Sequence, residues 1–237
     1  MSTHLHQARA ALKGNPTTGP DASLWAKIGY WAGISVLQLL LVEFVVSATW
    51  RGLYSYRNNF VSELGISFCG PAGNWPCSKL YVLMNASIAL FGVALIVAVL
   101  AWLVTGVLDV RGGALLAVAG GGAFVAGIVN QGVDYQIHSL GATVMFVVGS
   151  LGMIVAGGHP TLRVPVRIVV TSLGSLALAA SLLYIGGHNI GIGIGVVERT
   201  VVYSLLSATV VLAVANRSTA RKMASLLETS SPDDGPR

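Results

Sequence analysis

Charged side chains are scarce in this sequence. Asp, Glu, Lys and Arg together make up 10% of the 237 residues, whereas hydrophobic residues make up 54% and the mean hydropathy is +0.74. Ordinary soluble domains carry about a quarter charged residues, and so few charges could not cover the surface of a soluble protein of this length. This scarcity argues against an ordinary soluble enzyme or binding domain and favours a membrane protein.

The hydrophobic residues gather into six runs, each long enough to cross a bilayer as a helix, which takes about 20 residues. The runs cover residues 28–49, 80–105, 112–130, 137–156, 166–185 and 196–215. They lack the period-two alternation of barrel strands, which indicates helices. We therefore predict an all-α fold, a polytopic membrane helical bundle with six transmembrane helices over residues 25–217. Polar tails rich in Pro, Ser, Thr and Asp, residues 1–24 and 218–237, are expected to be disordered.

The sequence also lacks a recognisable signal peptide, because its first 24 residues are polar and its first hydrophobic run is full-length. Of the 14 Lys and Arg residues, ten fall on the side of the two termini and four on the other side. By the positive-inside rule, we expect a multi-pass protein of the plasma (inner) membrane with both termini in the cytoplasm. The basic excess then reflects orientation or anionic lipid, and we expect no nucleic-acid partner.

Cysteine is rare as well, and the chain has only Cys69 and Cys77, both in the predicted outer loop of residues 50–79. An oxidising outer compartment would let the two cysteines close a short loop, and the Gly and Pro residues between them help the chain to turn back. We therefore expect a Cys69–Cys77 disulfide, with two unlinked thiols as the alternative.

The remaining polar residues concentrate on the predicted outer side. They are Glu43, Asn58, Asn59, Ser62, Glu63, Asn85, Asn130, Gln131, Asp134, His138, His188, Asn189, Glu198 and Arg199. Ionisable residues at membrane depth are costly and usually face a cavity or a partner. Because these residues come from separate segments on one side of the bilayer, we expect them to converge on a site.

Two of these side chains allow alternative interpretations of one short segment. Asp134 is a good N-cap for the fourth helix, in which case His138 is a hydrogen-bonded packing residue. If the helix starts earlier, the spacing of four places both on one face, where the carboxylate fixes the histidine tautomer.

Simple structural roles are also available to most of the others. His188 suits a helix C-terminus, and Glu198 suits a helix N-terminus. Arg199 could reach the interface, and Ser62 with Glu63 could cap a short helix. Glu43 is explained by neither capping nor interfacial exposure, so it needs a partner, for which Arg199 and Arg51 are the candidates.

Three motifs together resemble a known family. They are NNFVSELG (58–65), GVDYQIHSLGA (132–142) and GVVERTVVY (195–203). These are similar to the bacterial and archaeal membrane proteins grouped as domain of unknown function 998, over about residues 28–216. The resemblance implies six helices and no particular activity, and the Cys69–Cys77 loop looks like a local elaboration.

A more distant resemblance is to membrane hydrolases of the alkaline ceramidase and adiponectin-receptor type, which hold zinc with Ser, Asp and three His residues. It implies analogous parts for Ser62, Asp134, His138 and His188, with His138, His188 and Asp134 as zinc ligands. This chain departs from that pattern, because it has six predicted spans rather than seven and lacks an H-x-x-x-H pair.

Two functions fit these observations. The first is a membrane-embedded hydrolase or transferase that acts on or binds a lipid or polyprenyl-linked substrate. Its predicted catalytic residues are His138, Asp134, His188, Glu63 and Ser62. Its predicted binding residues are Arg199 (a clamp for a phosphate or oxyanion), Glu198, Asn59, Asn85 and Glu43. The second is a non-enzymatic accessory or scaffold subunit of a membrane complex, and a small carrier comes third because no internal repeat is visible.

Overall fold

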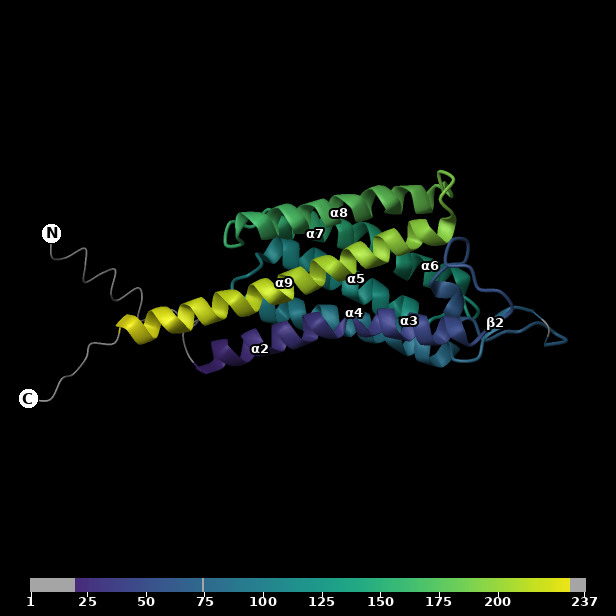
Figure 1. Cartoon of the computed structure of the whole chain (residues 1–237), viewed down its shortest axis with the longest axis horizontal. Coiled ribbons are helices and arrows are strands. Elements are labelled where there is room, and N and C mark those ends of the chain that lie inside the picture. Colours follow the sequence, from purple (N-terminus) through teal and green to yellow (C-terminus); the bar gives the residue numbers. More distant parts are fainter. Residues whose placement is uncertain (1–19, 74, 231–237) are drawn as a thin grey trace, which may run out of the picture.

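The helices of this protein lie side by side along one long axis (Figure 1). The computed structural model of the chain describes residues 20–73 and 75–230. Within them, six helical stretches are long and apolar enough to cross a membrane. They are Ser23–Ala48, Tyr81–Val104, Val110–Ile128, Tyr135–Gly157, Val164–Ile185 and Ile194–Arg217. The predicted six-helix membrane fold is confirmed.

Individual elements subdivide these spans. The helices are α2 (Pro20–Ser35), α3 (Gln38–Ala48), α4 (Tyr81–Val104), α5 (Val110–Ile128), α6 (Tyr135–Thr143), α7 (Gly149–Gly157), α8 (Val164–Ile185) and α9 (Ile194–Ser230). A π-helical turn, η3 (Val144–Val148), joins α6 to α7, and a 3-10 helix, η2 (Ser62–Gly65), lies in the first long loop. The strands β1 (Trp50–Arg51) and β2 (Cys77–Ser78) pair antiparallel in that loop.

The first and last helices extend into the predicted tails at both ends of the chain. Helix α2 begins at Pro20, and α9 continues to Ser230, where a disordered segment was expected from residue 218. Residues 218–230 are rich in strong helix formers, and the next proline along the chain is Pro232. An established helix gains one hydrogen bond for each residue added, so α9 extends past its apolar part. The rest of the predicted tails, 1–19 and 231–237, lies outside the described residues.

The two ends of the bundle differ in structure. One end carries the short connections 105–109 and 158–163. The other, hereafter the hairpin end, carries residues 49–73 and 75–80 with β1 and β2, and the connections 129–134 and 186–193 (Figure 1, right). The expected Cys69–Cys77 disulfide is confirmed and lies at the hairpin end. All the predicted site residues therefore lie at or near one end of the bundle.

Small residues let the helices approach closely, as expected for membrane helices. A Cβ at Gly92 of α4 would collide with the carbonyl oxygen of Gly120 on α5. A Cβ at Gly33 of α2 would meet Cβ of Ala213 on α9. Large side chains such as Trp102 and Phe146 are fully buried in the core that these contacts enclose.

The first span is broken between α2 and α3, at Val36–Leu37. Around the break the backbone forms i to i+3 hydrogen bonds, from Leu39 N to Val36 O and from Leu40 N to Leu37 O, each 3.1 Å long. Helix α2 packs along both α4 and α9, whereas α3 packs on α4 and η2. The break therefore lets the chain diverge from α9 as it approaches the hairpin end.

A polar contact between helices accompanies this break. Gln38, the first residue of α3, donates through Nε2 to the carbonyl oxygen of Ser87 on α4 at 2.9 Å. Ser87 Oγ donates in return to Gln38 Oε1 at 2.6 Å. This reciprocal pair ties the start of α3 to α4 rather than to α9.

Candidate functional site

Arg199 of α9 lies at the centre of the hydrogen-bond network at the hairpin end. Its Nε donates to Oε1 of Glu43 on α3 at 2.8 Å, and the two side chains are only 7% and 2% exposed. Nη1 donates to three backbone carbonyl oxygens, those of Tyr56, Asn59 and Gly195, at 2.7, 2.8 and 3.1 Å. Nη2 donates to the Tyr54 hydroxyl. A buried ion pair needs this degree of hydrogen bonding to offset its desolvation, and Arg199 is confirmed as the partner that Glu43 requires.

Two tyrosines of the first loop enclose the guanidinium group. Arg199 Cζ lies 5.5 Å from the ring centroid of Tyr54 and 4.8 Å from that of Tyr56, within cation–π range. The Tyr54 hydroxyl donates to the carbonyl oxygen of Phe60 at 3.0 Å. Burial raises the pKa of Tyr54 above its usual value, although the Arg199 charge opposes the shift. Tyr54 therefore stays a neutral phenol that links Arg199 to the loop.

Glycines at the start of α9 allow the first loop to reach Arg199. Gly193 has a φ of 102°, in the region that favours glycine. A Cβ there would collide with the carbonyl oxygen of Arg57, and a Cβ at Gly195 would collide with that of Asn59. Gly195 N donates to the Arg57 carbonyl oxygen at 3.0 Å. These contacts bring the carbonyl groups of the loop within reach of the guanidinium group.

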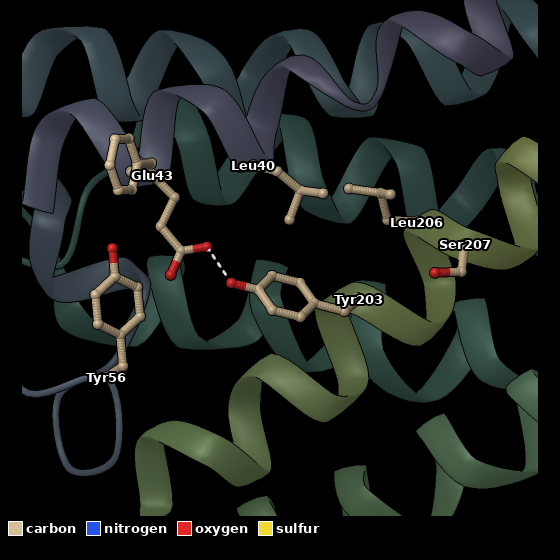
Figure 2. A pocket seen from close by; sticks show the side chains of 7 residues that line it. Leu40, Glu43, Tyr56, Tyr203, Leu206 and Ser207 are labelled. Atoms are coloured by element: carbon tan, nitrogen blue, oxygen red, sulfur yellow. Dashed lines mark hydrogen bonds between the residues drawn. The ribbon is translucent and has the colours of Figure 1, made fainter.

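A pocket of about 460 Å³ lies beside the ion pair, between α3 and α9; we call it the lateral pocket. Its lining consists of Leu40, Glu43, Phe44, Tyr56, Tyr203, Leu206 and Ser207. Figure 2 shows Glu43 and Tyr203 pointing toward each other across it, and the Tyr203 hydroxyl donates to Glu43 Oε2 at 2.7 Å. The Tyr56 hydroxyl lies 2.5 Å from Ser47 Oγ. The divergence of α3 from α9 thus leaves a space to which α3 contributes the Glu43 carboxylate and α9 contributes the Tyr203 hydroxyl.

The lateral pocket is polar at one end and mostly apolar at the other, where Ser207 is the single polar side chain of its lining. Leu40 lies about one turn before Glu43 in α3, and Leu206 lies about one turn after Tyr203 in α9. Glu43 is five residues from the last residue of α3, Ala48, or about 8 Å along the helix. The interfacial zone on each side of a bilayer is roughly 5 to 7 Å deep. The polar end therefore lies near the bilayer interface, and the apolar end lies toward the bilayer centre.

The mouth of the lateral pocket faces away from the bundle. Phe44 is 71% exposed, Ser207 is also exposed, and both lie within membrane-spanning stretches. Ser207 lies 13 residues from the first residue of α9, or about 20 Å along the helix, where exposed surface contacts acyl chains rather than water, whereas Phe44 lies near the interface. The lateral pocket therefore opens sideways to the lipid.

A second, smaller cavity of about 30 Å³ lies inside the bundle, with room for about one or two water molecules. Three predicted site residues, Ser62, His138 and Glu198, contribute to its lining. The other lining residues are Leu39, Val61, Ile88, Phe91, Ala126, Ala142, Met145, Phe146 and Val202. The buried Glu198 carboxylate accepts the backbone N–H of Val61. Residues of η2, α6 and α9 therefore meet around a space that is too small for a lipid.

His138 and Asp134 do not form a pair. Nδ1 of the buried His138 lies 2.9 Å from the carbonyl oxygen of Ala126 and 3.0 Å from that of Val129, so Nδ1 carries the proton. Asp134 instead caps α6, since its Oδ1 accepts the N–H groups of Gln136 and Ile137 at 2.9 and 3.0 Å. Of the two interpretations of this segment, the structure agrees with the one in which Asp134 caps the helix and His138 is a packing residue. His138 is hydrogen-bonded to the end of α5.

Four predicted residues, Ser62 among them, hold the loop around η2 in place. Asn59 Nδ2 donates to Glu63 Oε2 at 2.8 Å, and Asn85 Nδ2 donates to the Gly65 carbonyl oxygen at 3.0 Å. Ser62 Oγ donates to Gln131 Oε1 at 3.3 Å, which connects η2 to the α5–α6 connection. Their contacts are structural, and none of these side chains lines the lateral pocket.

The predicted zinc ligands are not brought together. His188 is exposed on the α8–α9 connection, and it lines neither cavity. Over residues 20–73 and 75–230, no group of three or more His, Cys, Asp and Glu side chains could hold a metal ion. The prediction that His138, His188 and Asp134 hold zinc is therefore wrong. The side chains of His138 and Asp134 are hydrogen-bonded to backbone groups, and His188 lies on another loop.

Tyr54, Tyr56 and Tyr203 belong to the site although no sequence motif indicates them. Tyrosine is common at membrane interfaces, so its presence there carries little information. For Tyr203 a signal existed, because its spacing of four from Arg199 places both side chains on one face of α9.

A family model described as protein of unknown function (DUF998) matches residues 34–215, which include every residue that lines the two cavities. The chain belongs to this family. The six membrane-spanning helices of this DUF998 protein are those that the resemblance implied. Searches of curated proteins and of solved structures found no match to it. The family description names no activity.

Proposed function

We propose that this DUF998 protein is a multi-pass plasma-membrane protein that binds a membrane lipid in the lateral pocket. The main support is the change in polarity along the pocket, which is polar near the bilayer interface and mostly apolar toward the bilayer centre. A lipid in the same leaflet has its polar headgroup and its hydrocarbon chain in the same order. The pocket volume of about 460 Å³ is in the range of small-molecule sites, about 300 to 1,000 Å³.

The lipid headgroup would lie against Glu43, Tyr56 and Tyr203, and the first part of its acyl chain against Leu40, Phe44 and Leu206. A lipid can enter directly from the bilayer, because the pocket opens sideways and Phe44 is 71% exposed at its mouth. The buried Arg199–Glu43 pair would keep the two walls at a fixed separation.

The same proposal places the hairpin end on the outer side of the membrane. Ten of the 14 basic residues lie on the side of the termini, which favours a cytoplasmic position for that side. The disulfide at the hairpin end fits an oxidising compartment. The lateral pocket would then draw its lipid from the outer leaflet.

We propose binding rather than hydrolysis because two predicted catalytic residues and the predicted clamp are engaged in the fold. Asp134 caps a helix, His138 bonds the end of α5, and Arg199 bonds Glu43 and the first loop. Arg199 therefore acts as a structural group and not as the expected clamp for a phosphate. The lipid pocket requires none of these groups to move.

The proposal is tested with the purified full chain in nanodiscs that contain a lipid with a photoreactive acyl chain. Mass spectrometry of the crosslinked peptides should place the label on Phe44 and Leu206. Ser207→Trp should fill the pocket and reduce this labelling at least about fivefold. Val214→Trp is the matched control, because Val214 is on the same helix, 52% exposed, and outside the pocket. Labelling that is spread evenly over all exposed helices, or that Ser207→Trp leaves unchanged, would contradict the proposal.

A further inference from the structure

The lateral pocket contains one acidic group and no basic one. Among its lining residues, which all belong to the described part of the chain, Glu43 is the single ionisable carboxylate and there is no Lys, Arg or His. Arg199 neutralises that carboxylate from behind, through the 2.8 Å salt bridge. The pocket therefore offers no net positive charge to an anionic ligand.

Arg199 has little capacity to bind a ligand anion as well. A guanidinium group has five N–H donors. Nε is used by Glu43, both hydrogens of Nη1 are shared among three carbonyl oxygens, and Nη2 donates one of its two hydrogens to Tyr54. Arg199 itself does not line the lateral pocket. A phosphate that entered from the lipid side would meet the Glu43 carboxylate, and that contact is repulsive.

At the polar end of the pocket, the tyrosine hydroxyl groups already donate their hydrogens to protein atoms, so their oxygens are left as acceptors. The Tyr203 hydroxyl donates its hydrogen to Glu43 Oε2. Ser47 Oγ donates to the Phe44 carbonyl oxygen, so the Tyr56 hydroxyl is the donor in the Tyr56–Ser47 contact. The carboxylate accepts one bond on each oxygen and has lone pairs left for others. A ligand group that is complementary to this end of the pocket must therefore donate a hydrogen bond, since the Ser207 hydroxyl lies about one helical turn beyond Tyr203, at the other end.

We infer that the lateral pocket selects a lipid alcohol, such as a diacylglycerol or a polyprenol, over a lipid that ends in phosphate. This inference rests on the proposed function, and it names the ligand class of that site. The ligand hydroxyl donates to Glu43 or to a tyrosine oxygen, and the hydrocarbon chain lies along Leu40 and Leu206. If a phosphate were buried beside Glu43, the phosphate oxygens would have no hydrogen-bond donors. Burial of an unpaired charged group at this depth has a high free-energy cost.

Competition between two lipids that differ by a single phosphate tests the inference. The full chain in phosphatidylcholine nanodiscs is labelled with the photoreactive lipid, and dioleoylglycerol or dioleoyl phosphatidic acid is added at increasing mole fraction. Dioleoylglycerol should halve the pocket labelling at a mole fraction at least about tenfold lower than phosphatidic acid. Tyr203→Phe, which removes one polar oxygen, should reduce that preference about five- to tenfold.

The outcomes separate the two claims. Equal or better competition by phosphatidic acid would overturn the lipid-alcohol inference and leave lipid binding in place. If neither lipid competes and Ser207→Trp does not change labelling, both the inference and the proposed function fail. A preference for dioleoylglycerol that Tyr203→Phe leaves intact would overturn the assignment of the polar end as the selective element.

Discussion

Arg199 and Glu43 are 156 residues apart in the sequence, and they form a salt bridge of 2.8 Å between α9 and α3. This pair spans the gap where α3 diverges from α9. It therefore connects the two helices that form the walls of the lateral pocket. The lateral pocket lies beside the pair, and Tyr203 connects the two through Glu43. The ion pair, the pocket and the break in the first span are thus parts of one arrangement.

Arg199→Met should be strongly destabilising, because it leaves the Glu43 carboxylate buried without its counter-charge. Removal of one partner from a buried ion pair costs about 3 to 5 kcal/mol. Arg199→Lys keeps the charge but not the planar set of donors, so it should lose a smaller part of the stability. The free energy of unfolding, measured by steric trapping in bicelles, provides the comparison. A change below about 0.5 kcal/mol for Arg199→Met would show that the pair is unimportant for the fold.

Asp134→Ala should cost about 1 kcal/mol of stability, the usual cost of losing a helix N-cap. Asp134→Ser should restore most of this loss, because a serine hydroxyl also accepts the free N–H groups of a first turn. Lipid labelling in the pocket should be the same in both variants after correction for the folded fraction. A folded Asp134→Ser protein without lipid labelling would indicate a role beyond capping.

His138→Ala should reduce stability by about 1 to 3 kcal/mol, because it leaves carbonyl oxygens of α5 buried without a donor. Treatment with a strong chelator should leave the melting temperature of the wild-type protein unchanged, since the described residues contain no set of three metal ligands. Elemental analysis of the purified protein provides the second check. Stoichiometric zinc that is lost in His138→Ala would restore the metal hypothesis.

The disulfide allows the orientation to be tested in cells. With the hairpin end outside, a membrane-impermeant reductant followed by an impermeant maleimide should modify Cys69 and Cys77 in intact spheroplasts. The chain has no other cysteine, so the signal needs no background mutations. A Cys69→Ser, Cys77→Ser variant is the control. Modification that requires lysis of the spheroplasts would place the hairpin end, and the mouth of the pocket, on the cytoplasmic side.

Hydropathy was sufficient to predict the six spans, because each is a continuous apolar run and the bilayer sets its length. The partner of Glu43 was predictable for a similar reason, since a lone acid at that depth requires a cation and few were within reach. The disulfide followed from two cysteines in one short loop. In each case a single strong physical constraint acts on residues that the sequence identifies.

The lateral pocket could not be predicted, because it depends on the break at Val36–Leu37. No proline or glycine occupies those two positions, so the local sequence carries no clear signal of a broken helix. The roles of Asp134 and His138 stayed open because they depend on where α5 ends relative to α6. Such details arise from packing between segments that are distant in the sequence.

The most direct test of lipid binding is a cryo-electron microscopy structure of the full chain in a nanodisc, with an antibody fragment bound to add mass. It should show elongated density between α3 and α9. One end of that density should lie within hydrogen-bond distance of Glu43 or Tyr203, and the rest should lie along Leu40 and Leu206. A gap that Phe44 closes by rotating inward, or that a second copy of the chain fills, would contradict the account.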